Sequence, residues 1–412
     1  MNVSQNMNET IINEFFKMVL RTELCDETIN VLCVEDKNSN IVMGTNFLSN
    51  FFKVKIVYTI LSKIDKKLSM QIANIVIKSE PKNGMQLTMV REQNMFIREL
   101  TMLKETLPKI EKLVHKQLGP KLWFGSSECR ILVMENLSEK GFIMKDRQKG
   151  LSMAHCLLVI EQLAKLHAGS VALHEKEPKL IESFKTGGIL SATCPESYMR
   201  LLEVSLLNMS KAIQGWADQK YNARIATKLD KLAKTIRDRC AVVYKYEPNE
   251  FCVLNHGDCW TNNIMFQEND NGKVSNVLMV DYQMSVYSSP AIDLHYFLNI
   301  CPQTEIKNEN DDFLLNLYLK TLTNTMTSIG CTTKAPTMKN LKAALHKRRI
   351  YAVFAGVVLA FRMMADVKDT EDFETVLKQL QGETKMDVFK NPDAVILAQK
   401  IIPIMDQRHY FD

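Results

Sequence analysis

The spacing of hydrophobic residues changes along the chain from a helical pattern to a strand-like pattern and back again. Residues 9–24 carry hydrophobic side chains three and four positions apart, which predicts an amphipathic helix. From about residue 29 the period shifts toward two, the spacing at which alternate side chains share one face of a strand. The pattern therefore predicts a helix followed by three strands, at 29–34, 51–61 and 70–78.

A hydrophobic segment with helical period over 87–107 predicts a long helix, and Pro81 and Gly84 separate it from the strand before it. Two shorter apolar runs, 122–124 and 130–134, predict two more strands. Beyond them the chain becomes mainly helical, apart from an irregular stretch at 171–195. Helices are expected at about 151–170, 196–246 (two helices divided near Gly215), 290–298, 311–328, 338–366, 371–381 and 391–405.

Residues 251–283 show a different pattern, in which three short apolar runs alternate with turns. The runs at 251–254, 264–266 and 277–280 have the length of short strands. Between the second and the third lies a segment rich in Asn, Asp and Gly, the residue types that tolerate turn geometry. This stretch is expected to fold as a strand and loop followed by a hairpin.

Polar residues stand where these short strands end. His256 and Asp258 follow the first run, Asn263 comes directly before the second, and Asp281 ends the third. The hairpin is therefore expected to bring two carboxylates and one amide together. The spacing His256-x-Asp258-x-x-x-x-Asn263 is that of the kinase catalytic loop, with Asp281 in the place of its metal-binding aspartate.

Such a set of groups suits phosphoryl transfer. Asp258 would accept a proton from the attacking hydroxyl or orient it, and Asn263 and Asp281 would hold Mg²⁺ against nucleotide phosphates. The alternative is a structural hairpin, since His-Gly-Asp alone also occurs in turns. The spacing, the hairpin and the apolar strand ending on an acid occur together in the right order, which favours the phosphotransferase interpretation.

Other residues upstream fit a nucleotide site. Gly44, Asn46 and Ser49 lie in a turn between two predicted strands, and such a turn can offer backbone N–H groups to phosphates, although it also suits an ordinary hairpin. Lys78 on a strand and Glu99 on the following helix have the order of the kinase ion pair. After the strand at 130–134, the backbone of Glu135, Asn136 and Leu137 can bond an adenine edge and form a hinge, so Glu135 and Leu137 are candidate nucleotide contacts.

Composition narrows the class of protein further. The chain has 412 residues, of which 46% are hydrophobic, enough for two domains or one two-lobed unit. Its 52 basic and 47 acidic residues give a formal charge of +5 without a basic block, so a nucleic-acid partner is not expected. The ten cysteines include no Cys-x-x-Cys pair, and the N-terminus has no signal-peptide pattern. The longest apolar stretch, 350–361, is too short to span a bilayer, so we expect a cytoplasmic protein in a reducing compartment with no membrane partner.

The motif as a whole resembles a known family. His256-Gly-Asp-Cys-Trp-Thr-Asn-Asn-Ile-Met-Phe266, with Asp281-Tyr-Gln283, resembles the signatures of the insect ecdysteroid-kinase-like (CHK-kinase-like) proteins, relatives of choline kinases and aminoglycoside phosphotransferases. Phe96-x-x-Glu99, the 134–137 segment Met-Glu-Asn-Leu and the 163–168 segment Leu-Ala-Lys-Leu-His-Ala are similar to further parts of that family, so the resemblance covers about 40–400.

The resemblance implies an α+β, two-lobed protein-kinase-like fold. A small N-terminal lobe with an antiparallel sheet would cover 1–134, a hinge 135–137, and a large, mainly helical lobe 138–412. It also implies ATP-dependent, Mg²⁺-dependent phosphorylation of a small-molecule hydroxyl, which for some members is that of an ecdysteroid.

Carried onto this sequence, the resemblance makes Asp258 the catalytic base and Asn263 and Asp281 the Mg²⁺ ligands, with Lys78 and Glu99 positioning the phosphates. His256 belongs to the same catalytic motif, and Gln283 and Asp293 are expected to support it. The chain departs from the family pattern at its glycine loop, Gly44-Thr-Asn-Phe47, and at the hinge, where Asn136 replaces an aspartate.

Several alternatives remain open. The acceptor could be an ecdysteroid, another steroid or a xenobiotic alcohol, or instead a choline, ethanolamine or aminoglycoside-like amino alcohol. The chain could also be a catalytically silent binding protein that keeps the fold. A protein kinase is disfavoured, because the segment between Asp281 and Asp293 leaves no room for an activation loop. The sequence does not determine the oligomeric state.

Overall fold

A computed structural model of the chain describes residues 3–36, 48–188, 190, 196–360 and 392–412. They form two compact units. The first comprises Met1–Val90 and Gly119–Phe142, and the second Arg91–Leu118 and Ile143–Asp412. Neither unit is one continuous stretch of the chain, because the helical segment 91–118 packs with the second unit. The predicted lobes, 1–134 and 138–412 with a hinge at 135–137, remain a prediction.

An antiparallel five-stranded sheet of order β1-β2-β3-β5-β4 forms the centre of the first unit. Its strands lie close to the predicted runs, since alternating hydrophobic residues give each strand one apolar face. Their bounds are β1 Asn30–Asp36, β2 Asn50–Leu61, β3 Leu68–Ser79, β4 Leu122–Ser126 and β5 Ile131–Glu135.

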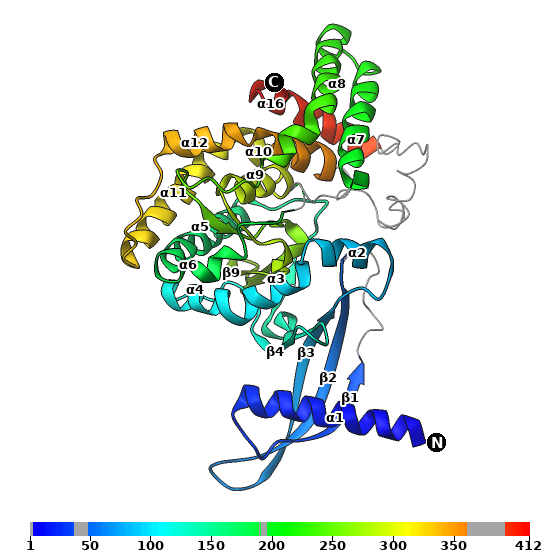
Figure 1. The fold of residues 1–412 in the computed structure, drawn as a ribbon, viewed down its shortest axis with the longest axis vertical. Helices are drawn as coiled ribbons and strands as arrows, with labels where there is room; N and C mark the ends of the chain where they lie inside the picture. The colour runs from blue at the N-terminus through cyan, green and yellow to red at the C-terminus, as the bar shows by residue number, and fades with distance from the viewer. Residues whose placement is uncertain (1–2, 37–47, 189, 191–195, 361–391) are drawn as a thin grey trace. The chain divides into compact units, whose positions relative to one another are not determined.

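Helix α1 (Val3–Leu24) lies across one face of this sheet (Figure 1). Phe16, Val19 and Leu20 of the helix are buried against inward-facing residues of the strands, such as Ile56 and Ile75. Burial of this one face provides the core of the first unit. The predicted helix at 9–24 is confirmed and begins earlier than expected.

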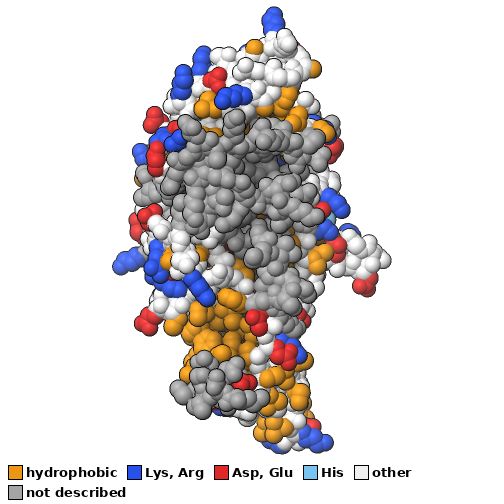
Figure 2. Space-filling model, turned by 90° about the vertical axis from the view of Figure 1, so that its right-hand side faces the viewer, with side chains coloured by type: hydrophobic (Ala, Val, Ile, Leu, Met, Phe, Trp, Pro, Cys, Tyr) orange, Lys and Arg blue, Asp and Glu red, His pale blue; other side chains and the backbone are white. Residues whose placement is uncertain are grey.

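The first half of β3 carries an exposed hydrophobic row at alternate positions. Leu68, Met70 and Ile72 are 69%, 67% and 56% exposed. Figure 2 shows hydrophobic side chains gathered on the surface in the lower part of the view, where Figure 1 places these strands. Farther along the same face of β3, Lys78 is only 1% exposed, so the two ends of this face differ in their surroundings.

The predicted single helix at 87–107 is instead a series of shorter helical segments. Asn94, with a left-handed φ of 52°, interrupts the first helix, and a π-helical segment follows the second. The series also continues beyond Pro108, because a proline in the first turn of a helix loses no hydrogen bond. The segments are α2 Gly84–Glu92, α3 Met95–Thr101, η2 Met102–Thr106 and α4 Leu107–Val114.

Helix α5 (Met153–Lys176) is the central helix of the second unit and packs against α4 and α11 (Asp311–Ser328). It is long and apolar enough to span a membrane, but 78% of its apolar window is buried within the protein. A β-carbon at Gly169 would lie 2.6 Å from the Ile110 side chain, so the α4–α5 packing requires glycine there. The prediction that residues 171–195 form an irregular segment was wrong for the first part of that range, where α5 continues and α6 (Pro178–Glu182) follows.

The remaining helices largely match the predicted pattern. The expected division near Gly215 is confirmed, and the expected helix at 338–366 is interrupted near Arg348. The predicted helix at 371–381 lies outside the described residues. The observed helices are α7 Glu196–Gln214, α8 Gln219–Ala241, α9 Ala291–Ile300, α10 Thr304–Glu309, α12 Met338–Lys347, α13 Arg349–Val353, the π-helical η6 Phe354–Leu359 and α16 Pro392–Gln407.

Two small sheets hold the motif-bearing stretch. One pairs β7 with β10, and the other has the order β6-β8-β9. The β8–β9 hairpin is the predicted one, with Ile264 opposite Met279. The strands are β6 Phe142–Met144, β7 Val253–Asn255, β8 Ile264–Glu268, β9 Val274–Met279 and β10 Val286–Ser288. An antiparallel sheet in one unit and a mainly helical second unit confirm the α+β fold class.

Candidate active site

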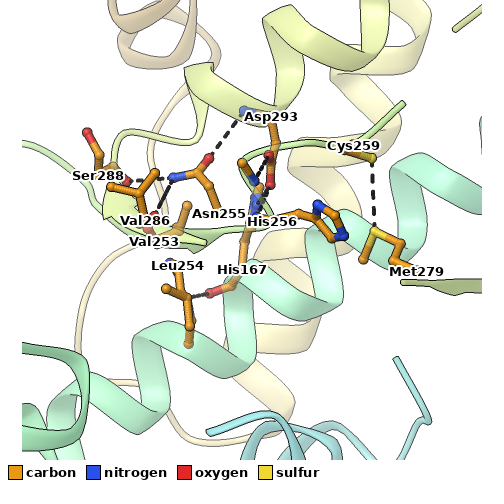
Figure 3. A network of polar contacts seen from close by, with 12 residues as sticks. His167, Val253, Leu254, Asn255, His256, Cys259, Met279, Val286, Ser288 and Asp293 are labelled. Carbon is orange, nitrogen blue, oxygen red and sulfur yellow. Dashed lines mark hydrogen bonds and ion pairs between the residues drawn. The ribbon is translucent and has the colours of Figure 1, made fainter. Parts of the chain in front are cut away.

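The loop after β7 is held by Asn255, the last residue of that strand. The Asn255 side-chain amide donates to the carbonyl oxygens of Val253, Val286 and Ser288 and accepts from the Asp293 N–H at 3.2 Å. Figure 3 shows this amide lying between the two strands and the start of α9. Because Asn255 is completely buried, its four hydrogen bonds fix where β7 ends and the loop begins. Sequence reasoning did not identify this residue.

Asp293 in the first turn of α9 anchors the backbone of the loop. Its carboxylate accepts the His256 N–H at 2.6 Å and the Gly257 N–H at 2.8 Å, and it lies 3.1 Å from His167 Nε2 (Figure 3). Asp293, expected from the sequence to support the catalytic motif, therefore holds the backbone of its loop. His167 is also hydrogen-bonded to Tyr318 and fully buried, as expected of a structural core histidine.

Gly257 cannot be replaced by a larger residue without moving the loop. Its φ is +84°, and a β-carbon there would lie 2.1 Å from the carbonyl oxygen of Met284. Glycine adopts positive φ at no steric cost, which explains its place in the motif.

His256 connects the loop to the end of β9. Its Nε2 lies 2.9 Å from the carbonyl oxygen of Val280 and therefore donates, which leaves Nδ1 to accept the Asp258 N–H at 3.3 Å. The ring is buried and lies 4.6 Å from that of Tyr282. Because both ring nitrogens bond backbone groups, His256 positions the loop, and we do not retain it as a catalytic group.

The Asp258 carboxylate is held from two sides. Its Oδ2 accepts from Asn263 Nδ2 at 2.8 Å, and its Oδ1 accepts from the Tyr296 hydroxyl at 2.6 Å. The same Asn263 nitrogen also donates to the Asp258 carbonyl oxygen at 3.0 Å. Since both of these partners are acceptors, the orientation of the amide is fixed, and the Asn263 amide oxygen points away from Asp258.

Tyr296 was missed by sequence reasoning, although a signal existed. It lies three residues after Asp293 on α9, so both side chains project from the same face of the helix. The Tyr296 ring stacks on Tyr351 at 5.9 Å, and the Tyr351 hydroxyl lies 2.8 Å from that of Tyr244. Burial raises the pKa of Tyr351 well above its usual value, so the Tyr351 hydroxyl is neutral.

Asp281 lies two residues beyond the end of β9, and its backbone is close to that of Asn263. The N–H of Val280, its neighbour, donates to the Asn263 carbonyl oxygen at 2.9 Å. Asp281 has a left-handed φ of 67°, unusual for an aspartate, and Gln283 Nε2 lies 3.4 Å from its Oδ2. Strained backbone of this kind is typical of functional sites, because packing around it must offset about 1 kcal/mol or more.

These donors suit Mg²⁺. The described residues contain no cluster of three or more His, Cys, Asp or Glu side chains able to hold a metal alone. Mg²⁺ is, however, commonly bound through one or two carboxylates completed by nucleotide phosphates and water. The carboxylate of Asp281 and the outward amide oxygen of Asn263 are oxygen ligands of that kind.

Arg98 ties the helix that carries Glu99 to the segment after Asp281. Its guanidinium donates to the carbonyl oxygens of Ser285 at 3.2 Å and Ser183 at 3.3 Å, and it lies 5.9 Å from the Phe184 ring. Burial lowers the pKa of Arg98 to about 10, so it remains charged at neutral pH. The local sequence gave no signal for this residue.

The predicted nucleotide contacts fall in both units. Lys78 on β3 is buried in the first unit, with Nζ 5.5 Å from the centre of the Phe51 ring. Glu99 on α3 is buried in the second unit, and the ion pair predicted between the two residues remains a prediction. Gly44 and Asn46 lie outside the described residues, whereas Ser49 is half-buried just before β2.

The predicted hinge residues are buried at the end of β5. The Glu135 carboxylate accepts the Lys121 N–H at 2.8 Å and forms an ion pair with Lys140. The Asn136 side chain accepts the Ser138 N–H at 3.1 Å and so caps a short 3₁₀ turn that begins at Leu137. These contacts fix the backbone of the segment but do not test the predicted adenine contact.

Comparison with protein families identifies the chain. The model of the ecdysteroid kinase-like family matches residues 43–331. The chain belongs to the ecdysteroid kinase-like family. The match includes the His256–Asn263 loop and Asp281, so it confirms the resemblance noted in the sequence.

Two solved structures were also found to be similar to this family member. A macrolide 2'-phosphotransferase type I is 12% identical, with 90% of this chain and 97% of that chain covered, at a TM-score of 0.35. A putative fructosamine-3-kinase from Haemophilus somnus 129PT is 10% identical, with 89% and 97% covered, at a TM-score of 0.33. Comparison with curated proteins found no match.

Proposed function

We propose that this protein transfers the γ-phosphoryl group of ATP to a hydroxyl of a small organic molecule. The observation that carries the proposal is the Asp258 carboxylate, held by Tyr296 at 2.6 Å and by Asn263 at 2.8 Å on a loop anchored by Asp293. A carboxylate fixed in this way is pre-organised to orient a hydroxyl and take its proton. Membership of a kinase-like family supports the same reaction.

In this proposal the acceptor oxygen attacks the γ-phosphorus while its proton moves to Asp258. The new oxygen–phosphorus bond forms as the bond to the β-phosphate oxygen breaks, and ADP leaves. Asn263 and Asp281 would hold Mg²⁺, which neutralises phosphate charge when bound. His256, Gln283 and Asp293 act through the loop, as positioning residues.

The nucleotide contacts of this proposal come from the sequence motifs. Lys78, with Glu99, would position the phosphates, and the backbone at Glu135 and Leu137 would bond the adenine. Gly44, Asn46 and Ser49 would lie over the phosphates. We infer an ecdysteroid or another steroid or xenobiotic alcohol as the acceptor, because a cluster of aromatic rings, Tyr296, Tyr351 and Tyr244, lies beside the Asp258 carboxylate. A choline-like or aminoglycoside-like cation would instead be expected to meet paired negative charge.

The test measures ADP formation by purified protein with Mg-ATP and a panel of ecdysteroids, sterols, phenols and amino alcohols. Acceptor-dependent turnover is expected, and Asp258→Asn should reduce it by about 10²–10⁴-fold, the usual range for loss of a general base. Asp312→Asn, a carboxylate-to-amide change at a site 73% exposed, is the matched control and should leave turnover unchanged. Full turnover by Asp258→Asn would refute the role given to Asp258.

A silent binding protein would give a different result. Mg-ATP would raise the melting temperature through mass action, yet no acceptor would increase ADP formation. That outcome would refute the proposed reaction while leaving the nucleotide site intact.

A further inference from the structure

A small cavity lies beside the loop that carries Asp258. Its volume is about 40 Å³, room for roughly three water molecules. Its walls come from the catalytic loop, through Trp260 and Thr261, from the 147–150 segment before α5, from the end of α9 and α10, from Ala360, and from Leu397 of α16. All of these elements belong to the second unit.

The walls of this cavity are fixed by backbone hydrogen bonds. The Leu151 N–H donates to the Cys301 carbonyl oxygen at 2.7 Å, and the Gln303 N–H donates to the Leu151 carbonyl oxygen at 3.0 Å. At Gly150 a β-carbon would lie 3.0 Å from the Gln303 nitrogen. The 147–150 segment could therefore not lie so close to the Gln303 backbone with another residue at position 150. The cavity is therefore built into the fold.

The charged side chains that line the cavity are all positive among the described residues. Arg147, Lys149 and Lys307 line it, and no Asp or Glu does so among the described residues. Two carboxylates nearby offset only part of this charge. Asp146 lies 3.8 Å from Lys149 in an exposed pair, and Asp311, which acts on Lys307 through space, forms a 2.7 Å ion pair with Arg408. The cavity thus carries an excess of positive charge.

Lys307 is the unusual member of this set, because it is only 8% exposed. Its ammonium group donates to the Ile300 carbonyl oxygen at 3.1 Å, its one hydrogen bond among the described residues, although an ammonium carries three N–H donors. Burial lowers the pKa of Lys307 to about 8, which still leaves it charged at pH 7. A buried cation with unused donors is costly unless an anion or water satisfies it.

We propose that this cavity is a subsite for a small oxyanion, that is, a phosphate, sulfate or carboxylate group held by Lys307 from within and by Arg147 and Lys149 from the surface. The volume fits one such group, and the cations supply the charge-assisted hydrogen bonds that bind it.

The oxyanion has two possible sources, since Trp260 and Thr261 are two and three residues from Asp258. It is either a free anion or an acidic substituent of the acceptor. The second source rests on the proposed function; binding of a free anion does not.

Titration calorimetry with inorganic phosphate at pH 7, constant ionic strength and saturating ADP tests the subsite directly. ADP occupies the nucleotide site, so the phosphate that still binds reports on other sites. Saturable binding is expected, weakened about tenfold or more by Lys307→Met and severalfold by Lys149→Ala. Lys149 is exposed, so its change leaves folding intact, and Lys320→Met on the exposed face of α11 is the control. No saturable binding, or binding unchanged in both cavity variants, would overturn the proposal.

A second measurement separates the two sources. Turnover is compared for matched acceptors, a sulfated alcohol and its unsulfated form, in the wild type and Lys307→Met. A KM raised about tenfold for the sulfated member alone assigns the subsite to the acceptor. Equal effects on both members assign it to a free anion. If no acceptor is turned over at all, the proposed function fails, and the phosphate titration still decides the subsite.

Discussion

Replacing Asp293 by asparagine tests how the catalytic loop is held. The aspartate carboxylate accepts from His256 N–H, Gly257 N–H and His167 Nε2, whereas the amide of Asn offers one oxygen and one donor nitrogen. Whichever way the amide turns, its nitrogen faces an N–H donor and leaves a buried donor without a partner. The substitution keeps the size of the side chain, so packing is unchanged.

The magnitude follows from these contacts. A hydrogen bond to a charged group contributes about 1.5–3 kcal/mol, and an unsatisfied buried donor costs about 1–3 kcal/mol. These two free energies partly describe the same lost hydrogen bond, so they are not added in full. We expect a loss of about 3 kcal/mol in the free energy of unfolding of the second unit. At about 2 °C per kcal/mol, the melting temperature should fall by about 6 °C.

Thermal unfolding followed by tryptophan fluorescence is a suitable assay, because Trp260 is buried in the same loop. Asp312→Asn is the matched control, with an exposed carboxylate and an expected change within about 0.5 kcal/mol. A melting temperature for Asp293→Asn within about 2 °C of the wild type would refute the reasoning, since it would mean that the buried N–H groups do not depend on the charge.

Two other predictions concern the Tyr296 hydroxyl that donates to Asp258 and the buried His295. Tyr296→Phe removes the 2.6 Å hydrogen bond to Asp258 but keeps the stack on Tyr351, so kcat should fall about tenfold while the KM for ATP stays constant. A lower melting temperature with unchanged kcat would instead show a purely structural role. Burial lowers the pKa of His295 to about 4 from its usual 6.5, so the unfolded chain binds its proton first as the pH falls. Stability should therefore be lost between pH 6.5 and 4, by up to roughly 3 kcal/mol from this residue. His295→Gln can keep the donor to the Leu345 carbonyl oxygen, and urea unfolding at several pH values should show a shallower loss; the same pH dependence in both proteins would contradict the assignment.

Much of the site could be predicted because its signals are local. His256, Asp258, Asn263 and Asp281 all lie within one stretch of 26 residues. The β8–β9 hairpin, which brings Asn263 and Asp281 together, closes through a turn of Asn, Asp and Gly. The prediction of a single helix over 87–107 was wrong, because the break in that helix has no signal in the local sequence. Its hydrophobic period continues across Asn94, but the structure places that residue in the left-handed region and starts a new helix there.

The sequence by itself determined the family, the α+β class and the polar groups of the catalytic motif, because periodicity, turn residues and motif spacing depend on neighbours along the chain. The tertiary structure alone decided what those groups touch. Tyr296 reaches Asp258 from 38 residues away, Arg98 reaches Ser285 from 187, and Lys307 lines the cavity beside Trp260. Such contacts form when helices pack together and remove side chains from water. The spacing of residues along the chain does not indicate which distant residue a given side chain will contact.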